Sequence, residues 1–133
     1  MTDLKLQDGG EIMLRQIHPN FIHDGEPSSD RFRPSERDEN MLSVDRGSMT
    51  SAADAHILYT STGALSGAVF GVSVGEFSNE AVPCISDEIK ATDTAPANPA
   101  HTLADFSGHN LARQKLISKK LKRAAVLRGR LHP

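Results

Sequence analysis

Residues 68–77 read AVFGVSVGEF and carry the strongest β pattern in the chain. Their side chains separate into two faces, Ala68, Phe70, Val72 and Val74 on one and Val69, Gly71, Ser73, Gly75 and Phe77 on the other. Alternation with a period of two predicts a strand over 68–77. Because small residues dominate the second face, we expect a helix or another backbone to approach it closely.

Further strands and helices are predicted on both sides of this segment. Apolar or alternating runs predict strands over 11–17, 41–44, 82–85 and 101–106, of which the third is limited to a sheet edge by its proline. The capping pattern Ser-Ala-Ala-Asp at 51–54 predicts a helix to about residue 60, and a longer helix is predicted over 110–128, ended by Gly129. The elements follow no regular βαβ order. We therefore predict an α+β fold: a small mixed or antiparallel sheet with one short helix and a long basic C-terminal helix.

The length of 133 residues suits a single domain, 1–133, with one modest core. Within it, residues 1–10 are expected to be a frayed start and 91–100 a loop rich in Pro and Ala. The uncharged run 55–75 is long enough to cross a bilayer, but four glycines and several Ser and Thr interrupt it. A helix end, a turn and a buried strand are expected there, and no membrane association is predicted.

A single cysteine, Cys84, excludes an internal disulfide and a cysteine-based zinc site. This composition favours a reducing compartment, and the first residues lack the apolar core of a secretory signal. We therefore expect a cytoplasmic protein. The six histidines show no metal-ligand spacing on a predicted helix, so no metal site is predicted.

The net charge of −2 hides a strong asymmetry along the chain. Residues 1–110 hold 7 Lys/Arg and 17 Asp/Glu, a balance of −10, whereas residues 111–133 hold 8 Lys/Arg and no acid. The cationic C-terminal segment must therefore be balanced by the acidic body or by an anionic partner.

An arginine-rich polar segment spans residues 18–46, and we expect it to form a long loop region with a turn at Asp24-Gly25 and a short helical turn at 35–40. Five of its seven acids lie among the arginines: Asp30, Glu36, Asp38, Glu39 and Asp45. One interpretation is an internal arginine–carboxylate network that holds the loop to the body. The other is a binding loop in which some arginines remain available for a phosphate or carboxylate. The candidate binding residues are Arg31, Arg33, Arg37 and Arg46.

The predicted helix 110–128 is the second candidate site. Its apolar arc is expected to comprise Leu116, Ile117, Leu121, Ala124 and Leu127, with the lysines outside. Three interpretations remain open: a docked helix that offsets the acidic body, a surface for an acidic protein, or contact with a nucleic-acid backbone. The candidate binding residues are Arg113, Lys115, Lys119, Lys120, Lys122 and Arg123.

The segments IHPNFIHDG (17–25), SSDRFRPS (28–35) and DENMLSV (38–44) resemble small uncharacterised bacterial proteins, a similarity over the first half of the chain that implies no activity. The chain is also distantly similar to ADP-ribosyltransferase-like domains. That similarity implies an NAD-consuming enzyme or toxin, with Arg15 or His18, Ser43 and Glu76 or Glu88 in catalytic positions. The Ser-Thr-Ser run and the Glu-x-Glu pair of that family are not present.

No stretch carries a motif that specifies a reaction, and neither Ser43 nor Cys84 lies in a nucleophile motif. The favoured hypothesis is a non-catalytic binding or assembly module of an intracellular bacterial system, without a cofactor. It would contact a protein partner through the 18–46 segment and the basic C-terminal helix. The alternatives are the NAD-consuming transferase and a protein that binds nucleic-acid backbones.

Overall fold

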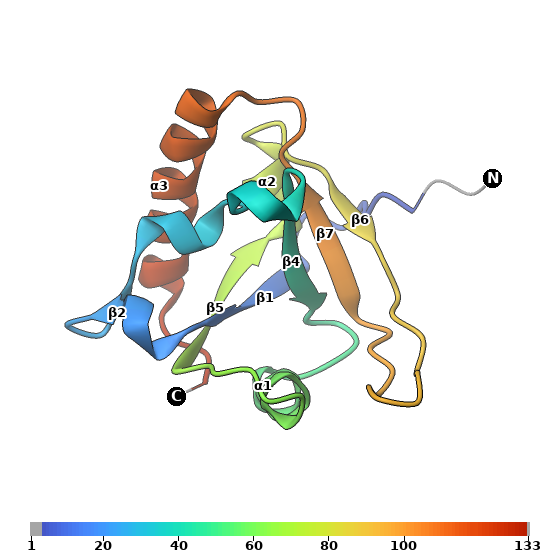
Figure 1. Ribbon diagram of the computed structural model, residues 1–133. Coiled ribbons are helices and arrows are strands. Elements are labelled where there is room, and N and C mark those ends of the chain that lie inside the picture. Colours follow the sequence, from blue (N-terminus) through green and yellow to red (C-terminus); the bar gives the residue numbers. More distant parts are fainter. Residues whose placement is uncertain (1–3, 133) are drawn as a thin grey trace.

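The computed structural model describes residues 4–132, and in this range five strands form one antiparallel sheet in the order β5-β1-β4-β7-β6 (Figure 1). The strands are β1 (Ile12–Ile17), β4 (Met41–Arg46), β5 (Ala68–Ser73), β6 (Cys84–Ser86) and β7 (His101–Asp105). The helices are α1 (Ala52–Ser61), α2 (Val74–Ser78) and α3 (Leu111–Arg128). The predicted α+β class is thus confirmed.

Helices cover the two faces of the sheet (Figure 1). On one face, α3 contributes Ile117, Leu121 and Ala125 to a core that includes Met13 and Phe70. On the other face, α1 packs through Ala55, which forms a smaller cluster with Leu14 and Val69. Strand residues therefore alternate between two apolar layers, and β5 is buried at every position.

The strand β5 ends at Ser73, four residues earlier than its alternating pattern predicts. The side chain of Ser73 accepts a hydrogen bond from the backbone N–H of Glu76 at 3.0 Å, and the Glu76 carboxylate accepts one from the Ser73 N–H at 2.8 Å. This reciprocal capping box begins α2, so the strand predicted over 74–77 is wrong. The Ser-x-x-Glu pattern that causes the change is present in the sequence.

The small face predicted over 68–77 is approached closely, by the Gly9 backbone at Gly75 and by side chains at Gly71. A β-carbon at Gly71 would lie 2.6 Å from Cγ2 of Ile12 and 2.8 Å from Cδ1 of Leu131. The C-terminal backbone also pairs with the outer edge of β5, because Leu131 donates to the Val69 carbonyl at 2.8 Å and Val69 donates to the His132 carbonyl at 2.9 Å. Only glycine leaves room for this packing.

The opposite edge of the sheet is flanked by the N-terminal residues. The Leu6 N–H donates to the Cys84 carbonyl at 2.8 Å, and the Ser86 N–H donates to the Leu4 carbonyl at 3.0 Å. Within the predicted frayed start, residues 4–6 therefore lie along β6, whereas residues 1–3 lie outside the described range. Chain from both ends covers the strand edges, which limits pairing with other molecules.

The helix α3 begins after Asn110, whose side chain accepts from the Arg113 N–H at 2.9 Å, and it ends at Arg128, with Gly129 as its C-cap. Its buried side consists of Gln114, Ile117, Ser118, Leu121 and Ala125. The predicted apolar arc is therefore wrong at two positions, because Leu116 is 53% exposed and Leu127 is 82% exposed.

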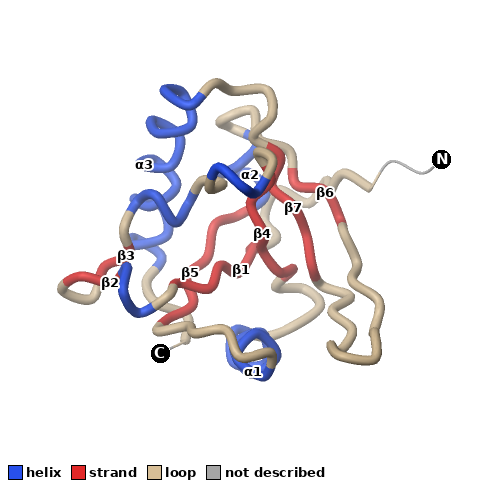
Figure 2. The backbone as a smooth tube through the Cα atoms, in the orientation of Figure 1, coloured by secondary structure: helices blue, strands red, loops and turns tan. Residues whose placement is uncertain are grey.

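The 18–46 segment is more ordered than a loop. It contains a small hairpin, β2 (Ile22–His23) and β3 (Glu26–Pro27), three short 3-10 turns (Pro19–Phe21, Ser29–Phe32 and Glu36–Asp38), and the strand β4. The predicted turn at Asp24-Gly25 joins the hairpin with positive φ at both residues, 53° and 82°. Figure 2 shows this hairpin projecting beside α3.

No helix among residues 4–132 is both long enough and apolar enough to cross a membrane. The uncharged run 55–75 is divided between α1, a connecting turn, β5 and the start of α2.

Candidate functional site

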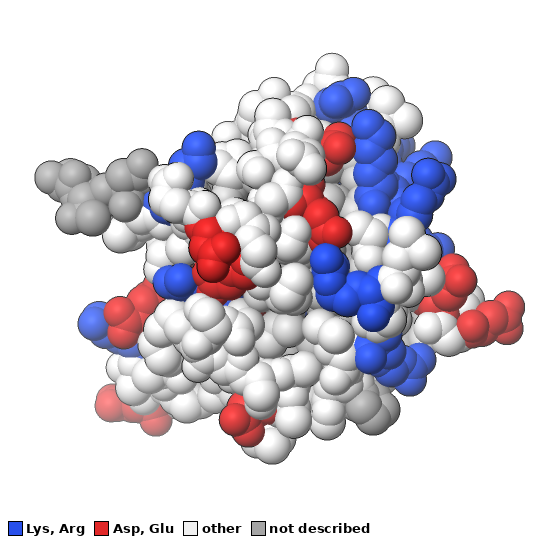
Figure 3. Space-filling view, turned by 180° about the vertical axis from the view of Figure 1, so that it is seen from behind, with Lys and Arg blue, Asp and Glu red and all other residues white. Residues whose placement is uncertain are grey.

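The exposed side of α3 combines cations with large apolar side chains. We call this set the outward stripe; it consists of Lys115, Leu116, Lys119, Arg123 and Leu127, which recur at helical spacing and are all exposed. The space-filling view in Figure 3 shows Lys and Arg gathered along the side of the molecule that α3 occupies.

The acidic body balances only part of the charge on α3. Three of its cations form ion pairs: Lys120 with Glu80 at 3.4 Å, Lys122 with Glu26 at 3.6 Å, and Arg128 with Glu76 at 2.9 Å. Four others, Arg113, Lys115, Lys119 and Arg123, form no ion pair with any residue in the range 4–132. The helix therefore keeps an excess of positive charge on its outer surface.

A groove of about 400 Å³ runs between α3 and the β2–β3 hairpin. Its walls include Lys119, Arg123 and Leu127 of the outward stripe, with Glu26 of the hairpin on the other side. The two segments singled out in the sequence thus meet at one surface. The last arginine of the chain also contacts the hairpin, because Arg130 donates to the Gly25 carbonyl at 3.5 Å.

Arg46 is paired internally. Its guanidinium donates to both carboxylate oxygens of Glu11, at 2.9 and 3.0 Å, and the Ser48 hydroxyl donates to the same carboxylate. Burial alone would raise the pKa of Glu11, but the hydrogen bonds from Arg46 and Ser48 outweigh it and lower the pKa. Arg46 thus ties the end of β4 to the residue before β1.

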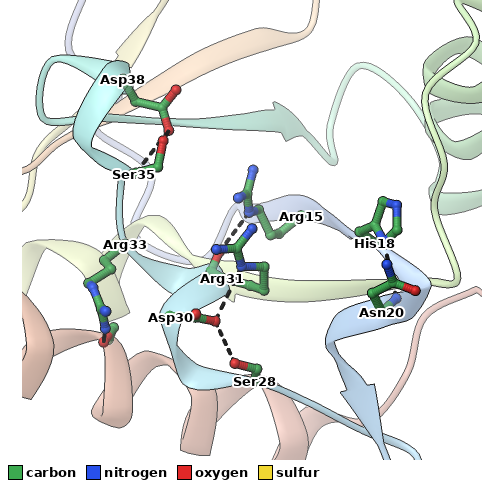
Figure 4. A network of polar contacts seen from close by, with 10 residues as sticks. Arg15, His18, Asn20, Ser28, Asp30, Arg31, Arg33, Ser35 and Asp38 are labelled. Atoms are coloured by element: carbon green, nitrogen blue, oxygen red, sulfur yellow. Dashed lines mark hydrogen bonds and ion pairs between the residues drawn. The ribbon is translucent and has the colours of Figure 1, made fainter.

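The other arginines of the 18–46 segment have different surroundings (Figure 4). Arg31 contacts Asp30 at 3.2 Å and lies over the Phe21 ring, 4.0 Å from its centroid. Arg33 donates to the Ser118 hydroxyl on α3 at 3.4 Å. Neither Arg33 nor Arg37 forms an ion pair within the described residues. Arg31 and Arg46 thus pair with single carboxylates, the adjacent Asp30 and the distant Glu11, whereas Arg33 and Arg37 do not.

Arg15 lies where two strands separate. The strands β1 and β4 are paired at Met13 and Leu14, and beyond that point they diverge. The Arg15 side chain reaches across the gap, donating to the Ser43 carbonyl at 3.1 Å and to the Arg31 carbonyl at 2.8 Å. It satisfies the Ser43 carbonyl of β4 and the Arg31 carbonyl of the 3-10 turn Ser29–Phe32.

The charge of Arg15 is not balanced by a contacting carboxylate within residues 4–132. Burial, with a smaller contribution from the neighbouring Arg31 cation, lowers the pKa of Arg15 to about 10, although Tyr59 and Asp38 act in the opposite direction. The group stays protonated at neutral pH. Figure 4 shows the Arg31 guanidinium beside that of Arg15.

The residues implied by the transferase resemblance do not form one cluster. Arg15 and Ser43 lie together, as described above. His18 and Glu76 instead follow opposite ends of the β1–β5 pair, whose register runs from Ile12 opposite Ser73 to Ile17 opposite Ala68. Five residue steps at about 3.4 Å separate those ends by roughly 17 Å. Glu76 is engaged by Arg128, and Glu88 contacts Lys90 at 3.6 Å.

A cavity of about 290 Å³ lies between the second face of the sheet, α1 and the loop that precedes β7. Its wall is mostly apolar, with Arg15, Gln16, Ser43 and Tyr59 among the polar residues. Gln16 is 8% exposed, and its Nε2 is buried without a hydrogen-bond acceptor in the described structure. An unsatisfied buried donor costs about 1–3 kcal/mol. Sequence reasoning missed this cavity, because no local pattern marks it.

The cysteine and the histidines of the described residues show no arrangement typical of a catalytic or metal site. Burial raises the pKa of the Cys84 thiol to about 12, so the thiolate is not formed at neutral pH. No group of three or more His, Cys, Asp or Glu within residues 4–132 could hold a metal ion. The rings of His56 and His132 are 4.9 Å apart, and His56 contacts the Ser66 carbonyl at 3.1 Å.

Comparison with known proteins adds no relative: no protein-family model, no curated protein and no solved structure matches the chain.

Proposed function

We propose that this protein is a non-catalytic binding module of an intracellular bacterial assembly, and that it binds an acidic protein segment along α3 and the neighbouring hairpin of the 18–46 segment. The observation that carries this proposal is the outward stripe. Three of its residues, Lys115, Lys119 and Arg123, are exposed cations that form no ion pair within the described residues. They lie beside Leu116 and Leu127, which are 53% and 82% exposed.

The charge distribution supports an anionic partner. The excess cations Lys115, Lys119 and Arg123 are exposed and form no ion pair within the described residues, so they have no evident role in stability. A one-signed patch on an otherwise acidic body attracts an oppositely charged surface and orients it on approach. This attraction weakens as ionic strength rises.

The exposed leucines Leu116 and Leu127 favour a protein over a nucleic acid. A phosphate backbone is bound through its charge and makes no use of exposed leucines. A protein segment with both acidic and apolar side chains would bury the exposed leucines of α3, and full burial of a leucine contributes about 1.5–3 kcal/mol. The occupant that fits is an amphipathic acidic helix or strand.

Fluorescence anisotropy with defined probes tests the proposal. The probes are a helical peptide with Glu and Leu on one face, an oligoglutamate of equal charge, and a short DNA duplex. We expect the amphipathic peptide to bind most tightly at about 50 mM salt and to weaken as salt increases.

Matched variants assign the surface. Lys119→Glu should weaken the peptide roughly tenfold, and Leu127→Ser about fivefold, whereas Lys90→Glu and Leu65→Ser, which are exposed elsewhere, should leave it unchanged. Tightest binding to DNA with no effect of Leu127→Ser would instead establish a nucleic-acid-binding protein. Absence of binding to every probe would overturn the proposal.

A further inference from the structure

We infer that the cavity between the sheet and α1 is a binding site for a small organic carboxylate with an apolar body, a role separate from partner binding at α3. The cavity and the outward stripe are built on different faces of the sheet, since α1 covers one and α3 the other (Figure 1). Binding of a small ligand in the cavity can therefore be tested without occupying the outward stripe.

The size and wall of the cavity define the body of the ligand. Its volume of about 290 Å³ is near the lower end of small-molecule sites. It is about twice the roughly 150 Å³ of a cavity known to hold benzene, so two fused rings or a chain of similar bulk would fit. Apolar side chains from three separate elements line it: Leu14 of β1, Ala55 and Leu58 of α1, and Ile89 and Pro96 of the loop.

The polar groups of the wall define the other end of the ligand. Arg15 is a cation whose two hydrogen bonds go to backbone carbonyls, and it forms no ion pair within the described residues. Gln16 contributes the buried Nε2 donor that has no acceptor. The acid in the same wall, Asp45, already accepts a hydrogen bond from Asn98 at 2.9 Å. Arg15 and Gln16 therefore supply the donors of this wall, and a carboxylate is a group that accepts hydrogen bonds from both.

Three probes of one shape test the inference: 2-naphthoate, the neutral 2-naphthalenemethanol and the cationic 2-naphthylmethylammonium. Each is titrated into the whole protein and followed by two-dimensional amide NMR. We expect 2-naphthoate to shift the resonances of cavity-wall residues selectively, with the alcohol at least tenfold weaker and the ammonium weaker still. Equal binding of all three probes, or no binding, would overturn the inference and leave a cavity that holds water or apolar solutes only.

Variants of the wall connect binding to the named groups. Ser43 lies on the wall at an exposed strand position, so Ser43→Phe should fill the cavity and abolish the shifts without lowering the melting temperature. Gln16→Leu should weaken 2-naphthoate about fivefold with little change in thermal stability. It removes the Nε2 donor that has no partner, and Ser66, which donates to Gln16 Oε1 at 2.7 Å, also donates to the Ala68 carbonyl at 3.1 Å.

Arg15 needs a paired test, because it also bonds backbone carbonyls. Arg15→Gln should weaken 2-naphthoate at least tenfold, and Arg15→Lys should restore part of the loss; the control Arg37→Gln should have no effect. If Arg15→Gln does not fold, the affinities of Arg15→Lys and Gln16→Leu for 2-naphthoate test the inference instead. Unchanged affinity in both of those variants contradicts the inference.

Discussion

The pair formed by Glu11 and Arg46 gives the sharpest stability prediction, through the substitution Glu11→Gln. The Glu11 side chain is 4% exposed and that of Arg46 is 27% exposed, and two hydrogen bonds of 2.9 and 3.0 Å join them. Glutamine keeps the shape but removes the charge, and its NH₂ group faces the guanidinium. Arg46 is then left without its carboxylate partner.

The expected loss follows from this burial. Removing one partner of a fully buried pair costs about 3–5 kcal/mol. Water reaches part of Arg46, so we expect about 2 kcal/mol in the free energy of unfolding at neutral pH. At about 4 °C per kcal/mol for a chain of this size, the melting temperature should fall by about 8 °C.

The stability contributed by the Glu11–Arg46 pair should decrease in acid. The folded-state pKa of Glu11 is lowered from 4.5, because the hydrogen bonds from Arg46 and Ser48 outweigh the raising effect of burial. A lowered carboxyl pKa contributes stability that is present in full above the unfolded pKa and is lost as pH falls through the folded pKa. The difference between wild type and Glu11→Gln should therefore shrink in acid.

A double-mutant cycle in urea measures the pair directly. Wild type, Glu11→Gln, Arg46→Met and the double variant should give a coupling free energy of about 1–2 kcal/mol at neutral pH, and this coupling should decrease as pH falls through the lowered folded-state pKa of Glu11. A coupling near zero at neutral pH, or one that does not change with pH, would refute the reasoning.

Three further outcomes are expected. Cys84 in the folded protein should resist iodoacetamide, because burial raises its pKa to about 12, and fast labelling without denaturant contradicts this. Gly71→Ala should lower the free energy of unfolding in urea by about 1–3 kcal/mol, since its β-carbon would lie 2.6 Å from a neighbouring side chain. The control Gly108→Ala, whose β-carbon would lie in open space, should change this free energy by under about 0.5 kcal/mol. Equal effects of the two substitutions would disprove the packing argument. Arg128→Met should speed amide exchange in the last turn of α3 by removing the ion pair with Glu76, and wild-type exchange rates there would show that the pair does not hold the helix end.

The two proposed sites use opposite faces of one sheet, and this arrangement allows them to be separated by mutation. Substitutions at Lys119 and Leu127 change only exposed positions of α3, whereas Ser43→Phe and Gln16→Leu act beneath α1. A protein that loses one activity and keeps the other would show that the sites are independent.

Local patterns in the sequence located most of the secondary structure. The strands β1 and β7 and the helix α3 were predictable, because alternation, capping residues and a terminal glycine act within a few residues of each other. The end of β5 was predicted wrongly, since Val-Gly-Glu-Phe at 74–77 continues the alternation while Ser73 and Glu76 cap a helix. Two local signals conflicted there, and the hydrogen bonds of the cap prevailed.

The sequence by itself determined the α+β class, the uneven charge along the chain, and the cationic character of α3. Only the tertiary structure decided which side of α3 is buried. Gln114 and Ser118 lie inside because distant groups satisfy them: Asn40 accepts from Gln114, and Arg33 donates to Ser118. Leu116 and Leu127 are consequently exposed. Burial of a polar side chain depends on partners remote in the sequence, and no local pattern encodes them.

The cavity beneath α1 is also formed by contacts between residues that are far apart in the sequence. It exists because β1 and β4 diverge beyond Leu14 and because Arg15 bridges the gap to Ser43. The sequence shows an arginine in a strand, and only the folded chain shows that its charge has no contacting carboxylate within the described residues. Pairing of strands and charges is decided by the three-dimensional arrangement, since it joins residues that are far apart along the chain.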